Sequence, residues 1–156
     1  MKFSHVMSVA GIAVLAALAP AAAAAAVPSP SALTVKVGGS IQNNGSGTSG
    51  LAAGVDYVFH PASTLEPFAG SIYADLLGSS IGAGLAIHNT GPLYAGAGLG
   101  VYSVSADSQT ASGVGAKVFG GFEIAPHTTL ELGYHFLPQV RGMSENTATL
   151  QLGIRF

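Results

Sequence analysis

The stretch Leu150-Gln151-Leu152-Gly153-Ile154-Arg155-Phe156 lies at the end of this 156-residue sequence and alternates between two kinds of side chain. Every second residue is apolar, and the residues between them are polar, charged or glycine. Successive side chains of a β-strand point to opposite faces, so this period of two predicts a strand with one apolar face. The same period can be followed backwards through the sequence, and it decides the fold class.

Seven further segments repeat this alternation, and clusters of Gly, Asn, Ser and Pro separate them. Together with residues 148–156 they make eight predicted strands, the others being residues 33–37, 51–59, 68–76, 81–87, 93–101, 114–124 and 130–136. A helix is disfavoured where glycine recurs at every second position, since each glycine destabilises a helix by about 1 kcal/mol relative to Ala. We therefore expect an all-β fold, a closed antiparallel eight-stranded β-barrel whose narrow lumen is filled by small inward residues beside bulky ones.

The first segment of the chain is typical of a secretory signal peptide. Lys2 precedes an apolar run at residues 6–18, Pro20 breaks the run, and a stretch of alanines ends at Ala26. This order predicts a signal peptide at residues 1–26, cleaved near Ala26, and a barrel domain at residues 27–156 of a protein exported by a bacterium. A retained anchor helix is disfavoured, because Pro20 interrupts the run before it reaches the ~20 apolar residues that a span needs.

The composition excludes several classes of function. Charged residues make up 8% of the chain and the mean hydropathy is +0.51, whereas an average soluble domain has roughly 25% charged residues. From Val27 onward, four positive and seven negative residues give a net charge of −3, and no basic cluster indicates a nucleic-acid partner. The absence of cysteine excludes a disulfide framework, a thiolate metal site and a lipid-modified amino-terminal cysteine.

The charged residues of the predicted strands share one parity, opposite to the apolar residues of the same strands. They are Lys36, Asp56, Asp75, Lys117, Glu123, Glu131 and Arg155. A soluble barrel shows the inverse pattern, with charges outside, whereas a charge on the lipid face near the bilayer midplane costs about 2 to 4 kcal/mol. The parity therefore predicts a transmembrane barrel with a charge network in its lumen, in which Glu131 lies towards Arg155 and Lys36 lies beside Asp56.

The predicted connections alternate between the two ends of the barrel. With the first strand starting in the periplasm, inner turns fall at His60-Pro61, Gly91-Pro92 and Ala125-Pro126, and outer loops at residues 43–50, 106–112 and around Arg141. Short inner turns and longer outer loops are typical of outer-membrane barrels. Aromatic residues are expected to form two girdles, with Tyr57, Phe59, Phe68, Phe122 and Phe156 near the inner rim and Tyr134 and Phe136 near the outer rim.

A signal peptide, eight alternating segments and a last strand ending in Phe resemble the small outer-membrane barrels of the OmpA-domain and OmpX type. The glycine-rich residues 92–100 are similar to a central strand of that family. The resemblance implies an outer-membrane location. It also implies that the last strand is read by the barrel-assembly machinery as an insertion signal, carried here by Leu150, Leu152, Ile154 and Phe156.

An enzyme is a weaker interpretation. Among eight-stranded outer-membrane barrels, the lipid A deacylases carry His and Ser two residues apart, the pairing of base and nucleophile that acyl hydrolysis needs. Here Thr129 follows His127 and Leu137 follows His135, so neither pair fits, although Ser144 and Glu145 near His135 leave a divergent arrangement open. His60, His88 and His127 lack the spacing of a metal site, and we expect no metal, cofactor or catalytic residue.

The sequence thus predicts a monomeric outer-membrane barrel with a structural or surface-interaction role and a lumen plugged by side chains and inward charges. A narrow channel for small solutes and a lipid-modifying enzyme remain as alternatives. The expected partners are outer-membrane lipid and, during biogenesis, the assembly machinery. The outer loops are short, and their sequences do not indicate a ligand.

Overall fold

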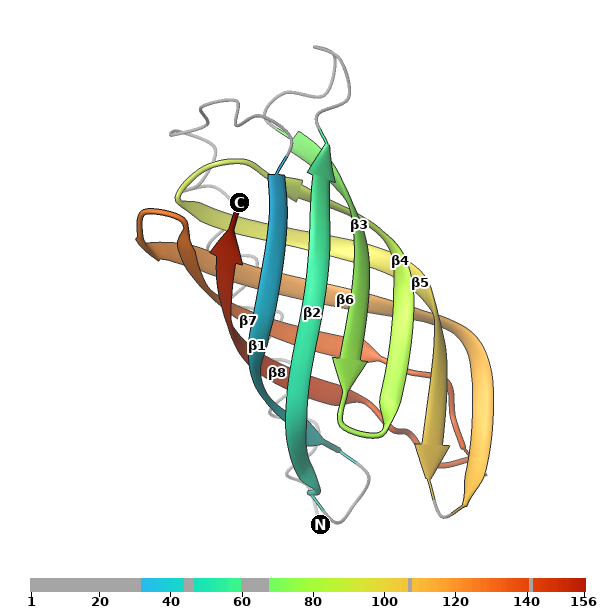
Figure 1. Ribbon diagram of the computed structural model, residues 1–156. Coiled ribbons are helices and arrows are strands. Elements are labelled where there is room, and N and C mark those ends of the chain that lie inside the picture. Colours follow the sequence, from blue (N-terminus) through green and yellow to red (C-terminus); the bar gives the residue numbers. More distant parts are fainter. Residues whose placement is uncertain (1–31, 44–46, 60–67, 107, 141) are drawn as a thin grey trace, which may run out of the picture.

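The computed structural model describes residues 32–43, 47–59, 68–106, 108–140 and 142–156. They form one closed barrel in which each strand pairs antiparallel with the next and β8 pairs with β1 (Figure 1). The strands are β1 Ala32–Gln42, β2 Ser49–Phe59, β3 Phe68–Leu77, β4 Ser80–Asn89, β5 Leu93–Ala106, β6 Gln109–Ala125, β7 Thr128–Phe136 and β8 Thr147–Arg155. The predicted fold class is confirmed, and each of the eight predicted segments coincides with a strand.

Some predictions lie outside the described residues. These are the signal peptide at residues 1–26 with cleavage near Ala26, the turn at His60-Pro61 and the position of Arg141. No helix among the residues that the structure describes is both long enough and apolar enough to cross a membrane.

The two ends of the barrel differ in what they carry, and we name them accordingly. The terminal end holds the start of β1 and the end of β8, whereas the distal end holds the β3–β4 and β5–β6 turns and the connection at residues 137–146. In Figure 1 the C terminus lies at the top and the two hairpin turns lie at the bottom.

The predicted loop at residues 106–112 is wrong. β5 continues to Ala106 and β6 begins at Gln109, so two residues connect them, and Ser108 takes a φ of 62° in the turn. The strands extend this far because cross-strand hydroxyl pairs join them, with Ser112 Oγ 3.2 Å from Ser103 Oγ. Residues 60–67, between β2 and β3, lie outside the described residues, so the short turn predicted there stays a prediction.

The outward face of the barrel is apolar on every strand. Its exposed large hydrophobic side chains include Leu51, Leu99, Val114 and Phe156, the last with 74% of its surface exposed. No described strand residue of outward parity is charged. The period of two that predicted the strands therefore corresponds to an outside that is apolar and an inside that is not.

The lumen is filled by aromatic rings that lie over inward glycines. A Cβ atom built on Gly84 would lie 2.7 Å from the Tyr73 hydroxyl, and one built on Gly121 would lie 2.6 Å from the Tyr94 hydroxyl. Gly115 makes the same kind of room for Tyr102. Small inward residues therefore lie beside bulky ones, and the glycine-rich strands provide the space for the rings.

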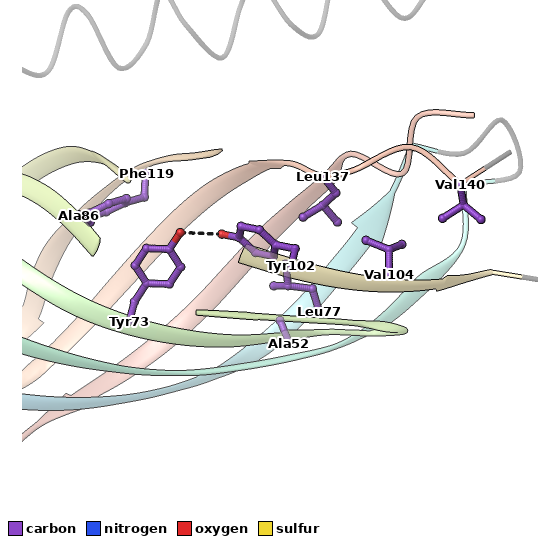
Figure 2. Close-up of a cluster of buried hydrophobic side chains, with 9 residues drawn as sticks. All are labelled: Ala52, Tyr73, Leu77, Ala86, Tyr102, Val104, Phe119, Leu137 and Val140. Carbon is purple, nitrogen blue, oxygen red and sulfur yellow. Dashed lines mark hydrogen bonds between the residues drawn. The ribbon is translucent and has the colours of Figure 1, made fainter. Parts of the chain in front are cut away.

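Apolar side chains close the distal end of the lumen. Leu77, Val104, Leu137 and Val140 are buried in one cluster with Tyr102 (Figure 2). Leu137 and Val140 belong to the connection between β7 and β8, which folds back through a bridge between Val140 and Met143. We call these four residues the distal plug.

Candidate functional site: the polar network in the lumen

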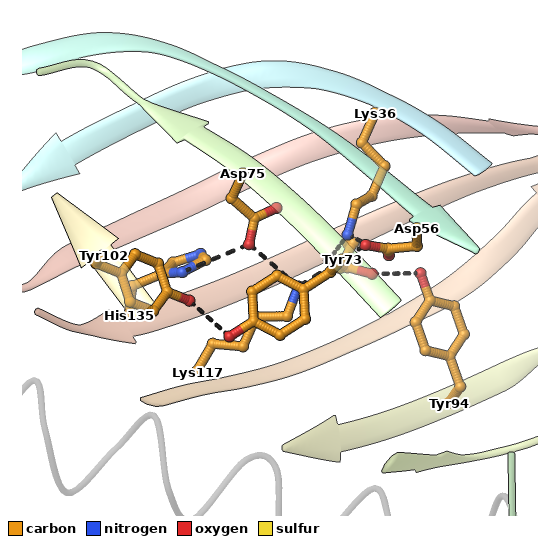
Figure 3. Close-up of polar contacts among 9 residues, drawn as sticks. Lys36, Asp56, Tyr73, Asp75, Tyr94, Tyr102, Lys117 and His135 are labelled. Carbon is orange, nitrogen blue, oxygen red and sulfur yellow. Dashed lines mark hydrogen bonds and ion pairs between the residues drawn. The ribbon is translucent and has the colours of Figure 1, made fainter. Parts of the chain in front are cut away.

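A chain of alternating charges crosses the middle of the lumen (Figure 3). Lys36 Nζ lies 2.7 Å from Glu131 Oε1 and 2.6 Å from Asp56 Oδ2. Lys117 Nζ lies 3.9 Å from Asp56 Oδ1 and 3.2 Å from Asp75 Oδ2. We call these five residues the lumen network; they come from β7, β1, β2, β6 and β3.

The lumen network is withdrawn from solvent. Lys36, Lys117 and Asp75 are each 2% exposed, Glu131 is 4% exposed and Asp56 is 9% exposed. Removing a charge from water is costly unless a partner of opposite sign and good geometry compensates it. Each ammonium in the network meets two carboxylates, so the burial of both ammoniums is compensated within the lumen.

Aromatic groups complete the network. The Tyr94 hydroxyl donates to Glu131 Oε2 at 3.0 Å, and Tyr73 and Tyr102 share a hydrogen bond between their hydroxyls, also at 3.0 Å. The Lys117 ammonium lies 3.7 Å from the centroid of the Tyr73 ring, a position in which the ring face attracts a cation. The rings therefore seal the network as well as fill space.

Glycines decide which strands these long side chains can join. Gly121 on β6 pairs with Tyr94 on β5 and with Glu131 on β7. The tyrosine therefore reaches the carboxylate over a residue without a side chain. Lys36 faces Gly54 on β2 and Gly153 on β8 in the same way. The lumen network and Tyr94 therefore also join strands that are not adjacent, such as β1 with β7 and β5 with β7.

Five of the seven charged residues predicted to meet in the lumen lie in this network, and two do not. Arg155 and Glu123 form a separate pair near the terminal end, with Arg155 Nη1 3.8 Å from Glu123 Oε2 and side chains that are 29% and 33% exposed. The expected approach of Glu131 to Arg155 is wrong. Glu131 pairs with Lys36, because Gly153 lets the lysine pass over β8.

The sequence interpretation overlooked the aromatic part of the site. Tyr73, Tyr94, Tyr102 and His135 all face the lumen, and the His135 Nδ1 atom lies 3.9 Å from Asp75 Oδ2. Tyr73 and His135 share the inward parity of the charged residues in their strands, and Tyr94 and Tyr102 have the parity opposite to the apolar residues of β5. The parity rule therefore already contained the information needed to find them.

Two further histidines, His88 and His127, lie among the described residues. His127 is exposed in the β6–β7 turn with a φ of 63°, while Thr129, two residues later, is buried on the lumen side. His88 packs against the rings of Tyr94 and Phe119. Within the described part of the chain, no group of three or more His, Asp or Glu residues is arranged to hold a metal ion.

Comparison with known proteins rests on structure, because no protein-family model and no curated protein sequence matches this chain. Neisserial surface protein A superposes with a TM-score of 0.52 at 18% identity, covering 81% of this chain and 96% of its own. The Yersinia pestis outer membrane protein Ail gives 0.55 at 9% identity, with 81% and 99% covered. The N-terminal β-barrel domain of Pseudomonas aeruginosa OprF gives 0.50 at 11% identity, with 81% and 98% covered.

The chain has the fold of the small eight-stranded outer-membrane β-barrels. The resemblance expected from the sequence is therefore confirmed at the level of the fold. The likeness covers nearly the whole barrel of each of these neighbours. At these low identities it is a likeness of the backbone fold.

Proposed function

We propose that this protein is an integral outer-membrane β-barrel with a structural or surface-interaction role and a plugged lumen. Its outward strand face carries no charge among the described residues, while its buried ammoniums and carboxylates lie inside. Such a distribution suits a bilayer, where a closed barrel satisfies its backbone groups internally and an outward charge is costly. The fold neighbours add support, since one is a neisserial surface protein and another is an outer membrane protein of Yersinia pestis.

The main support for the proposal of a plugged lumen is the lumen network itself. Its ion pairs link β1 to β7, β3 to β6, and β2 to β6, which lies four strands away around the ring. Nearer the distal end, the Tyr73–Tyr102 hydrogen bond and the distal plug add two further layers of side chains. An ion crossing the barrel would have to displace all three layers.

Conductance in a planar bilayer tests this proposal against a narrow solute channel. We expect the purified wild-type protein to give no discrete current steps, while a porin added to the same bilayer gives them. The Tyr73→Ala/Tyr102→Ala double variant serves as a comparison, because it removes one layer and leaves the charge chain. Discrete steps from the wild type would refute the plugged barrel and favour the channel.

We also propose that the protein is not an enzyme. The pair that most resembles a deacylase motif is divided between two surfaces, because His127 is exposed in a turn and Thr129 faces the lumen. Mass spectrometry of lipid A after expression tests this. Loss or addition of acyl chains relative to an empty-vector strain would contradict the proposal. If the same change in lipid A persisted with a His127→Ala variant, a different group in the barrel would be responsible for it.

The partners proposed for the barrel are outer-membrane lipid and the assembly machinery, with the barrel itself a monomer. Leu150, Leu152, Ile154 and Phe156 stand exposed on the outward face of the last strand, where a binding protein could read them. Replacing Phe156 with Asn is expected to lower the amount of barrel in the outer membrane while leaving refolding of the purified protein into detergent unchanged.

A further inference from the structure

The seam between β1 and β8 closes the barrel. It joins the first and the last strand, from Thr34 opposite Arg155 to Gln42 opposite Thr147. Its pairs are the most distant in sequence of any in the barrel, and contacts between distant residues carry the largest entropy of loop closure. The seam is therefore the place where the cylinder depends most on added interactions.

One ion pair of the lumen network crosses this seam. Lys36 stands on β1 opposite Gly153 of β8, and its ammonium donates to Glu131 Oε1 on β7 at 2.7 Å. A Cβ atom built on Gly153 would lie 2.6 Å from Thr129 Oγ1 and 3.2 Å from Lys36 Cγ. The lysine stem thus occupies the space above β8, and the ion pair encloses β8 between β1 and β7.

Both ends of this ion pair are anchored beyond the seam. Asp56 on β2 holds the Lys36 ammonium at 2.6 Å, and Tyr94 on β5 donates to the second oxygen of Glu131 at 3.0 Å. The pair Arg155–Glu123 joins β8 to β6 and does not reach β1. Of the ion pairs between described residues, Lys36–Glu131 is the one that bridges the seam.

We propose that Lys36 and Glu131 latch the β1–β8 seam, so that closure of the cylinder, more than formation of the strands, depends on this pair. Lys117 provides the matched comparison. It is an equally buried ammonium between two carboxylates, but it lies on β6 and its partners lie on β2 and β3, so neither end of its ion pairs is on a strand of the seam. The latch is independent of whether the lumen conducts.

Engineered disulfides can read the seam directly, because the chain has no cysteine of its own. Val37 and Leu152 face each other across the seam, and Leu85 and Leu99 face each other across β4 and β5. All four side chains stand exposed on the outward face. The rate of disulfide formation in full-length protein folded in detergent micelles would be measured for each cysteine pair.

In this assay Lys36→Met is expected to slow disulfide formation across the seam by at least about tenfold, since it leaves Glu131 buried without its cation. The β4–β5 pair should react at the wild-type rate. Glu131→Gln, which keeps the Lys36–Asp56 ion pair and so perturbs folding less, should slow the seam pair selectively as well. Lys117→Met should show no preference for the seam.

The latch would be overturned if Lys36→Met and Glu131→Gln left both cysteine pairs at their wild-type rates. It would also be overturned if these variants slowed both pairs by the same factor. A seam-selective loss in Lys117→Met would overturn it too, because the effect would then belong to any buried charge. Current steps in a bilayer would bear on the plugged lumen and leave this result untouched.

Discussion

Replacing Lys117 with Met removes the one ammonium that holds the β3 side of the lumen network. The Lys117 ammonium lies 3.2 Å from Asp75, 3.9 Å from Asp56 and 3.7 Å from the centroid of the Tyr73 ring, and the residue is 2% exposed. Methionine preserves most of the stem and none of the charge. Because Asp75 stays buried without the ammonium that it contacts, while Asp56 keeps Lys36, we expect the free energy of unfolding to fall by about 3 to 5 kcal/mol.

A second substitution separates lost charge from lost packing. Asp75→Asn removes the carboxylate that Lys117 contacts most closely, at almost constant side-chain volume. If charge is the cause, Lys117→Met/Asp75→Asn should be more stable than Lys117→Met alone, by at least about 1 kcal/mol, as coupled neighbours usually show. If packing against Tyr73 is the cause, the two losses should add.

The assay is urea unfolding of the protein folded in detergent micelles, followed by the gel migration difference between folded and heated barrel. A fitted free energy for Lys117→Met within about 0.5 kcal/mol of the wild type, the usual range for a surface change, would refute the reasoning. A loss in the double variant that equals or exceeds the sum of the two single losses would refute it as well.

Three other substitutions probe different layers of the barrel by the same unfolding assay. Arg155→Leu breaks only the partly exposed pair with Glu123 and should cost no more than about 1 kcal/mol; a larger loss would place Arg155 in the lumen network after all. Gly84→Ala should cost about 1 to 3 kcal/mol because its Cβ enters occupied space, whereas Gly39→Ala, with its nearest neighbour at 3.9 Å, should be close to neutral. Leu99→Arg on the outward face should cost about 2 to 4 kcal/mol in lipid vesicles, and stability equal to wild type there would argue against a bilayer around this face.

The sequence was sufficient to predict the strands and the inward face, because both follow from a period of two. Lys36, Asp56 and Asp75 were placed inside by parity alone, and the structure buries all three. The same rule applied to Tyr73 and Tyr102 would have placed their rings in the lumen. Parity is local to each strand, so it needs no knowledge of how the strands are staggered.

The partners of the charges could not be predicted in the same way. Whether Glu131 meets Lys36 or Arg155 depends on the stagger between β7, β8 and β1 and on the missing side chain of Gly153. The prediction assumed that partners lie on adjacent strands, whereas three of the four ion pairs in the lumen network join strands that are not adjacent. The extent of the β5–β6 hairpin was also missed, since small hydroxyl residues at its tip read as a loop although Ser103 and Ser112 pair across it.

The lumen network also has a consequence for the register of the barrel. If both faces of every strand were apolar, a slip of one residue would exchange the faces at little cost. With Asp56 inward, the same slip of β2 would turn a carboxylate outward and would break the contact with Lys36. In a bilayer an outward carboxylate is unfavourable, although it costs less than the about 2 to 4 kcal/mol of an Arg or Lys at the midplane. The ion pairs that fill the lumen therefore also favour a single register, and each inward charge penalises a slip of its own strand.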